Sequence, residues 1–132
     1  MGVSTLDDYL TKARSALDGV RPQLDELRVQ ADLARAEARD RIQNGIAAVQ
    51  KAQSQAKQQL DQATKAGQDT WQSTARQAEQ AVNEVGTQLQ AVVDQVQGAV
   101  GAAAPAARKA WTKFLDEWNR ERGDRERLID DG

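Results

Sequence analysis

The chain has 132 residues, and its apolar share of 39% leans heavily on alanine, with three tryptophans, one tyrosine and one phenylalanine to add bulk. It contains no cysteine and no histidine, which excludes disulfides, thiol chemistry, the common zinc ligands and the usual proton-transfer side chain near neutral pH. A net charge of −2 offers no electrostatic basis for binding nucleic acid. We therefore expect no cofactor, no metal and no nucleic-acid partner.

The first residues lack the basic and then apolar run of a secretory signal, and no stretch of about 18 apolar residues is present to span a bilayer. These two features predict a cytoplasmic protein. At this length we expect one domain, and a core built mainly from alanine must be thin.

A seam of small and aliphatic residues recurs every three or four positions from Leu6 to Val100, which predicts long amphipathic helices. Such a seam must be buried against another helix, a second copy of the chain or a lipid surface. We expect it to mediate self-association. Its principal members are Leu10, Leu17, Leu24, Leu27, Ala31, Ala34, Val82, Val85, Leu89, Val92 and Val96.

The first predicted element is a kinked helical arm. Ser4 and Thr5 are suited to cap its start, and Gly19 and Pro22 predict a kink or a tight restart. From Pro22 to about Lys65 the apolar pattern continues without a clear stop, so we expect one continuous helix there.

Gly67 is a good helix-ending residue and is followed by two good capping residues, Asp69 and Thr70, where the seam changes phase, and this predicts a reversal of the chain. A returning arm is expected from Thr70 to Gln97. A glycine- and alanine-rich break from Gly98 to Pro105 then leads into a short amphipathic helix that ends near Arg122.

The predicted fold is all-α without β structure: an elongated helical hairpin or coiled coil followed by a short C-terminal amphipathic helix. Its parts are a kinked hairpin over residues 1–104, an aromatic helix over 105–123 and a charged flexible tail over 124–132. Charged residues concentrate at the two ends of the sequence, whereas the middle is polar but nearly uncharged. Such a middle section can associate with itself or with a neutral surface, although glutamine is also a good helix former at exposed sites.

The aromatic helix carries the clearest candidate binding site. Four of its bulky side chains follow an i, i+3, i+4, i+7 spacing that places them on one helix face, with two lysines nearby. They either fill the widest part of a bundle or dock into a partner groove or the acyl boundary of a membrane. These candidate docking residues are Trp111, Phe114, Leu115, Trp118, Lys109 and Lys113.

No residue pattern supports catalysis. The paired carboxylates Asp7 with Asp8, and Asp116 with Glu117, are explained by helix capping and solubility, and no pocket-forming sequence accompanies them. The arginines after residue 119 alternate with acids and are typical of a solvated helix end. We expect a protein that is not an enzyme.

Three functions agree with these patterns. The first is a structural or adaptor protein that forms homo-oligomers through the seam and docks a protein partner through the aromatic helix. The second is a peripheral protein whose amphipathic helices coat a membrane or another lipid or polymer surface. The third is a largely disordered protein that protects against desiccation or stress.

Overall fold

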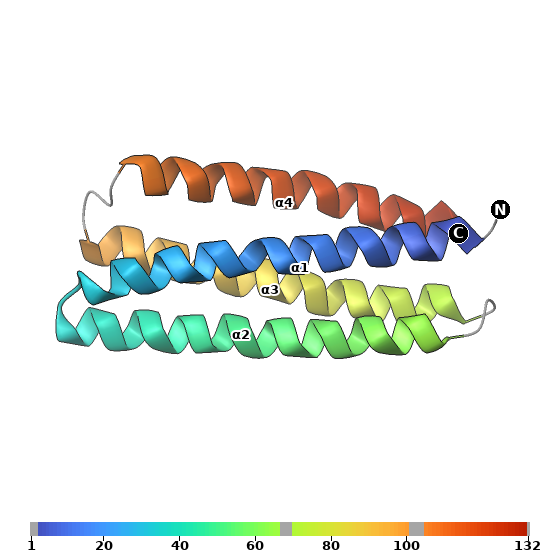
Figure 1. Ribbon diagram of the computed structural model, residues 1–132, viewed down its shortest axis with the longest axis horizontal. Helices are drawn as coiled ribbons and strands as arrows, with labels where there is room; N and C mark the ends of the chain where they lie inside the picture. Colours follow the sequence, from blue (N-terminus) through green and yellow to red (C-terminus); the bar gives the residue numbers. More distant parts are fainter. Residues whose placement is uncertain (1–2, 67–69, 101–104, 132) are drawn as a thin grey trace.

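The computed structural model confirms an all-α fold (Figure 1). The structure describes residues 3–66, 70–100 and 105–131, and within these ranges the chain forms four helices and no strands. The helices have nearly equal lengths: α1 is Val3–Asp32, α2 is Ala36–Lys65, α3 is Trp71–Val100 and α4 is Pro105–Asp131.

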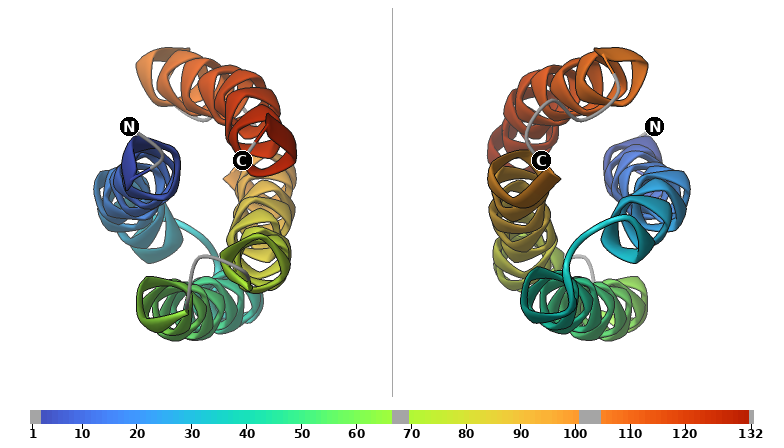
Figure 2. Two further views of the ribbon diagram at one scale, coloured as in Figure 1. Left: turned by 90° about the vertical axis from the view of Figure 1, so that its right-hand side faces the viewer. Right: turned by 90° about the vertical axis from the view of Figure 1, so that its left-hand side faces the viewer.

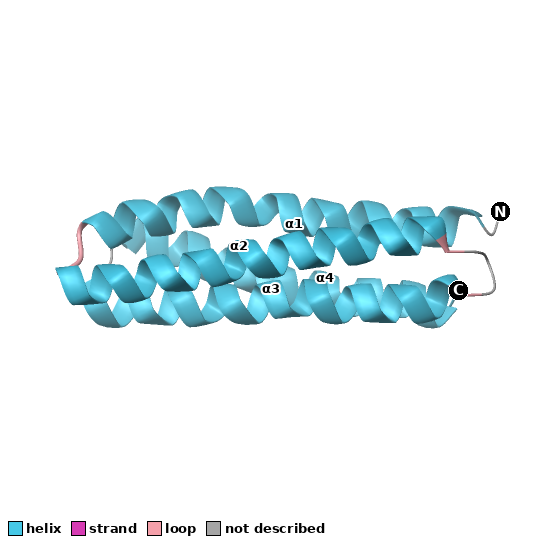
Figure 3. Ribbon diagram, turned by 90° about the horizontal axis from the view of Figure 1, so that it is seen from below, coloured by secondary structure: helices cyan, strands magenta, loops and turns pink. Residues whose placement is uncertain are grey.

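The helices run alternately up and down the long axis of the molecule (Figure 1) and are arranged around a common centre in the end-on views (Figure 2). α1 and α3 face each other across this centre, with α2 and α4 between them. The ends of all four described helices lie at the two ends of the bundle (Figure 3). The single long hairpin expected from the sequence is therefore replaced by a four-helix bundle.

The two ends of the bundle differ in what they contain. The start of α1 and the end of α4 lie together at one end, which we call the terminal end; the α2–α3 connection is also there (Figure 1). The α1–α2 and α3–α4 connections lie at the opposite end. As a result, α1 is joined to α2, and α4 is joined to α3, at the end of the bundle opposite the terminal end.

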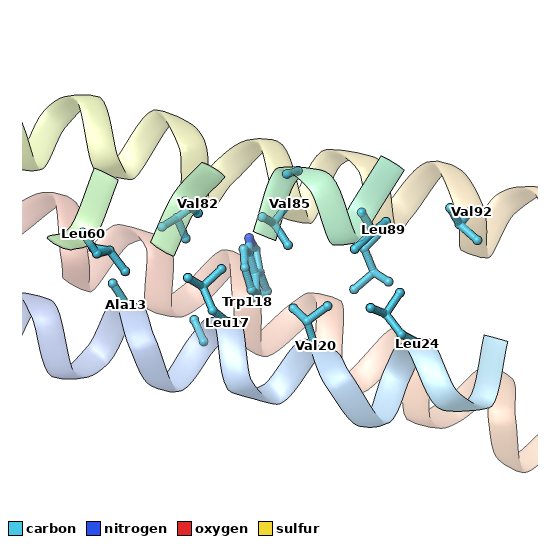
Figure 4. Close-up of a cluster of buried hydrophobic side chains, with 14 of the residues drawn as sticks. Ala13, Leu17, Val20, Leu24, Leu60, Val82, Val85, Leu89, Val92 and Trp118 are labelled. Carbon is cyan, nitrogen blue, oxygen red and sulfur yellow. The ribbon is translucent and has the colours of Figure 1, made fainter. Parts of the chain in front are cut away.

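The core follows the helical repeat of the apolar residues. Figure 4 shows Leu17 and Val20 of α1 facing Val85 and Leu89 of α3, with Trp118 of α4 between the two helices. Because the apolar stripes of all four helices point inward, they form one continuous buried cluster.

α2 and α3 make the most extensive contact of any helix pair. Small buried side chains such as Ala52, Ala56 and Ala78 line these two helices, and small residues allow close approach. A Cβ atom at Gly45 would lie 2.5 Å from Cγ2 of Val92, so the absence of a side chain at Gly45 is needed for this spacing. In contrast, no Cα atoms of α2 and α4 lie within 8 Å of each other in the described ranges.

The continuous helix predicted from Pro22 to Lys65 was wrong, because the chain reverses between α1 and α2. The backbone N–H groups of Leu33 and Ala34 each donate to a carbonyl three residues earlier, with N···O distances of 3.1 Å. This 3₁₀-type tightening ends α1 without glycine or proline. Pro22, where a kink or restart was predicted, lies inside α1. The turn between α1 and α2 therefore lacks the glycine or proline that usually indicates a chain reversal in a sequence.

The two later connections agree with the sequence. α2 ends at Lys65, α3 begins at Trp71 and the two helices are antiparallel, although Gly67 itself lies outside the described residues. α3 ends at Val100 and α4 begins at Pro105, a residue well suited to a first helical turn.

The short C-terminal helix and the flexible tail predicted from residue 124 were wrong, since α4 continues to Asp131. Arg125 and Ile129 are buried against the other helices. These contacts stabilise a charged segment whose composition alone predicted fraying. None of the helices, as far as they are described, contains a stretch long and apolar enough to cross a membrane.

Candidate functional site

A cluster of buried polar side chains joins three helices at the terminal end. It consists of Tyr9 from α1, Glu79 from α3 and Arg125 from α4, and we call it the polar cluster. Arg125 Nε donates to both carboxylate oxygens of Glu79, at 2.8 and 3.0 Å. Tyr9 Oη lies 3.1 Å from Glu79 Oε2 and 3.2 Å from the Ala75 carbonyl oxygen, so one proton serves two acceptors. A single carboxylate thus binds α1 and α4 to α3.

The guanidinium group of Arg125 is only partly satisfied. Its side chain is 0% exposed, and its Cζ atom lies 5.4 Å from the centroid of the Trp118 ring, within reach of a cation–π interaction. Nη1 and Nη2 are buried without a hydrogen-bond partner among the described residues. Burying unpaired donors of a charged group costs free energy, so the cluster both links the helices and carries a penalty.

Burial shifts the titration of both acids in the polar cluster. It raises the pKa of Glu79, and the nearby charge and hydrogen bond of Arg125 offset part of that shift. Burial likewise raises the pKa of Tyr9, to which the negative charge of Glu79 adds. Both shifts favour the neutral acid in the closed bundle.

The sequence of α4 positions Arg125 through a seven-residue repeat. Trp111, Trp118 and Arg125 follow one another at this spacing, which places them on one stripe of the helix. α3 accommodates the middle member at Gly86, where a Cβ atom would lie 2.4 Å from Trp118 Nε1. The indole therefore seats directly on the α3 backbone.

The predicted docking face of α4 points into the bundle. Trp111 and Trp118 are 1% and 4% exposed, while Phe114 and Leu115 are half-buried against the core. The rings of Phe114 and Trp118 lie 5.9 Å apart. In the closed chain these side chains fill the bundle, which was the alternative interpretation of their spacing. Any docking through them requires α4 to leave the bundle.

The two lysines assigned to the docking face lie outside the core. Lys109 and Lys113 are exposed and line an open groove of about 570 Å³ along α4, together with Arg108, Asp116 and Glu117. Four cations and two carboxylates line this groove. It presents no single charge to a ligand.

The predicted self-association seam is buried within one chain. Its α1 members face α2, α3 and α4, and its α3 members face the same interior. A second copy is not needed to cover it. The residues concerned are Leu10, Leu17, Leu24, Leu27, Ala31, Ala34, Val82, Val85, Leu89, Val92 and Val96.

Sequence reasoning missed the polar cluster because each member had an ordinary explanation. Arg125 was grouped with the solvated arginines of α4, and Glu79 lies among alanines of the seam. The spacing of Arg125 from Trp118 is the one signal that points to burial. The partners of Arg125 depend on how α1, α3 and α4 are arranged, which the seam does not specify.

A second groove, of about 330 Å³, lies between α3 and α4 beside the polar cluster and includes Arg76, Glu126 and Asp130. Arg76 and Asp130 form an exposed ion pair across it at 2.9 Å. In the described part of the chain, no group of three His, Cys, Asp or Glu side chains is placed to hold a metal ion.

The chain shows no significant similarity to any protein-family model, curated protein or solved structure with which we compared it. Functional inference therefore rests on the bundle itself, and above all on the contrast between its apolar interior and its polar exterior.

Proposed function

We propose that this is a non-enzymatic, peripheral lipid-binding protein whose bundle opens so that the apolar faces of α1 and α4 lie on a neutral phospholipid surface. The observation that carries the proposal is the inward orientation of the bulky apolar faces. Among the described residues, the exposed large apolar side chains are Val29 and Leu33 at the α1–α2 turn. The closed bundle therefore keeps its binding faces covered until it opens.

Bulk is distributed unevenly among the helices in a way that favours α1 and α4 as the lipid-binding pair. Three of the seven buried residues of α2 are alanines. α1 also buries three alanines, but with four leucines and a tyrosine, and α4 buries two tryptophans. Burying one leucine contributes about 1.5–3 kcal/mol, and alanine contributes a fraction of that. The bulky residues of α1 are Tyr9, Leu10, Leu17, Leu24 and Leu27.

The aromatic face of α4 is suited to the boundary between acyl chains and head groups. Trp111 and Trp118 combine a large apolar ring with an N–H donor, and such rings favour this boundary. The exposed Lys109 and Lys113 lie near the same turns. Acidic residues on the exposed side of α4 and the net charge of −2 favour neutral rather than anionic lipid.

Cross-linking the helices tests whether opening is needed for binding. The chain has no cysteine, so the two introduced cysteines are the only thiols that react with a cross-linker. Arg14 and Asp61 approach to 3.6 Å between α1 and α2, and Arg76 and Asp130 approach to 2.9 Å between α3 and α4. One variant carries Arg14→Cys and Asp61→Cys, the other Arg76→Cys and Asp130→Cys. A short bis-maleimide then locks each pair.

A pair within one helix provides the matched control. Asp25 and Arg28 are exposed in α1 and form an ion pair at 2.9 Å, so cross-linking cysteines there leaves all four helices able to separate. Flotation with phosphatidylcholine vesicles measures binding. We expect the chain and the control to float with the vesicles and both locked variants to lose most of this binding. Equal binding by the locked variants would exclude opening, and no binding by the unmodified chain would exclude the lipid surface.

Self-association is the second candidate function. The seam residues that would join two copies are already buried in one chain, so a dimer also requires opening or exchange of helices. Sedimentation equilibrium without lipid distinguishes the two cases. A stable oligomer that does not bind vesicles would favour the structural or adaptor role over the lipid surface.

A further inference from the structure

We propose that α1 and α4 swing away from the α2–α3 hairpin at the terminal end, and that the polar cluster of Tyr9, Glu79 and Arg125 is the latch that holds them closed. The inference rests on the proposed lipid-surface function. It specifies which helices move and which contacts must be released.

The connections of the bundle permit this movement. α1 is joined to α2 between Asp32 and Ala36, and α4 is joined to α3 between Val100 and Pro105, both at the opposite end (Figure 1). At the terminal end, neither α1 nor α4 is covalently joined to the α2–α3 hairpin. The hairpin itself is the most closely packed helix pair, so it is the part expected to stay intact.

The polar cluster lies where such a movement must begin. Tyr9 of α1 and Arg125 of α4 both bind the carboxylate of Glu79 on α3. Because they share one acceptor group, loss of either contact changes the electrostatic environment of the other. The latch therefore couples the release of α1 to the release of α4.

The free-energy cost of burying the polar cluster is suited to a contact that must be released. Replacing a buried ion pair with apolar side chains of similar volume is often neutral or stabilising, so ionic groups here are not needed for maximum stability. The unpaired Nη1 and Nη2 atoms of Arg125 add to the cost of the closed state. When the helices separate, Arg125, Glu79 and Tyr9 all regain water, and this lowers the cost of opening.

Two variants that change the latch in opposite directions test the proposal. Arg125→Met leaves the carboxylate of Glu79 buried without its cation and should loosen the latch. The triple variant Tyr9→Phe, Glu79→Met and Arg125→Met makes the site apolar and should tighten it. Asp130→Asn is the matched control, since it removes an exposed α3–α4 ion pair at the same end.

Hydrogen exchange without lipid measures opening directly. Removing one partner of a buried pair leaves an uncompensated buried charge, so Arg125→Met should speed exchange in α1 and α4 by at least about a hundredfold and in α2 and α3 much less. The triple variant should slow exchange in α1 and α4, and it should bind phosphatidylcholine vesicles more slowly than the unmodified chain. The control should match the unmodified chain within about fivefold, since an exposed ion pair contributes at most about 1 kcal/mol.

Lowering the pH distinguishes two causes of faster exchange in Arg125→Met: the unpaired charge of Glu79 and a packing defect at the substituted side chain. The charged or titratable groups around Glu79 are Tyr9, Arg125 and Glu126, together with Arg76 and Asp130 of the adjoining groove. Removing the cation of Arg125 raises the pKa of Glu79 further. Lowering the pH favours protonation of this carboxylate and should slow exchange in the variant more than in the unmodified chain.

Three results would overturn the latch: unchanged opening in the triple variant, equally faster exchange in all four helices of Arg125→Met, or no recovery of that variant in acid. If the exchange results hold but no variant binds vesicles, the latch stands and the lipid-surface function is wrong.

Discussion

The contact between Gly86 and Trp118 provides a direct test of how α4 packs on α3. A Cβ atom added at Gly86 would lie 2.4 Å from Nε1 and 2.8 Å from Cε2 of the indole, and both atoms belong to the rigid ring. The Gly86→Ala variant must therefore displace Trp118 or the α4 backbone. Gly123→Ala in α4 is the matched control, because a Cβ atom there meets no heavy atom within 4 Å.

The two substitutions should change stability in opposite directions. Alanine is favoured over glycine inside a helix by about 1 kcal/mol, and Gly123→Ala should gain that amount. At Gly86 the same gain is outweighed by overpacking, which costs about 3 kcal/mol for a contact this short. The net loss is about 2 kcal/mol. With an unfolding entropy of about 0.28 kcal/mol per degree for this length, Gly86→Ala should melt about 7 °C lower and Gly123→Ala about 4 °C higher.

Thermal and urea unfolding followed by far-UV circular dichroism measure both changes on the same chain. Near-UV dichroism, which senses the packing of the tryptophans, should change for Gly86→Ala and remain the same for Gly123→Ala. If Gly86→Ala is as stabilising as Gly123→Ala, Trp118 does not seat on α3 and the assignment of the polar cluster fails with it.

Three further predictions test other contacts of the bundle. Gly45→Ala should destabilise the α2–α3 hairpin by about 1–2 kcal/mol, and Val92→Ala should partly rescue it, which a double-mutant cycle by urea unfolding measures. Tyr9→Phe should cost about 1 kcal/mol at pH 7. The raised pKa of Tyr9 means that the tyrosine ionises first in the unfolded chain, near pH 10, so stability from this group is lost as the pH rises above that value. Unfolding of the chain and of Tyr9→Phe should be compared between about pH 8 and about pH 11. The free energy of unfolding should fall less steeply with rising pH in the variant. Removing the exposed Arg76–Asp130 pair with Asp130→Asn should change stability by less than about 1 kcal/mol, and a larger change in urea unfolding would show that this pair is not solvent-screened.

Periodicity predicted the helices and their buried faces well, because a 3.6-residue repeat is a local property. Leu17 and Val85 are buried as the seam indicates, and the break before Pro105 is confirmed. The number of reversals was missed. The turn at Leu33 contains neither glycine nor proline, and Ala34 beside it is buried in the four-helix bundle.

The polar cluster was beyond prediction for a different reason. Whether Arg125 is solvated or buried depends on the length of α4 and on which helix lies opposite, and neither quantity is encoded within the last turns of the chain. The same holds for Glu79, which only acquires its partners once α1 and α4 pack on α3. Pairwise tertiary contacts, unlike helical faces, have no local repeat from which they can be inferred.

The bundle combines two kinds of helix contact whose stabilities respond differently to water. Between α2 and α3, apolar side chains pack closely and gain nothing from hydration when they separate. Between α3 and the terminal ends of α1 and α4, the contact includes an ion pair and a tyrosine that water stabilises once they are exposed. The difference in free energy between closed and open states should therefore be smallest at the terminal end. We therefore expect the chain to open at that end before its hairpin melts, which would expose the leucine-rich face of α1 and the tryptophan-rich face of α4.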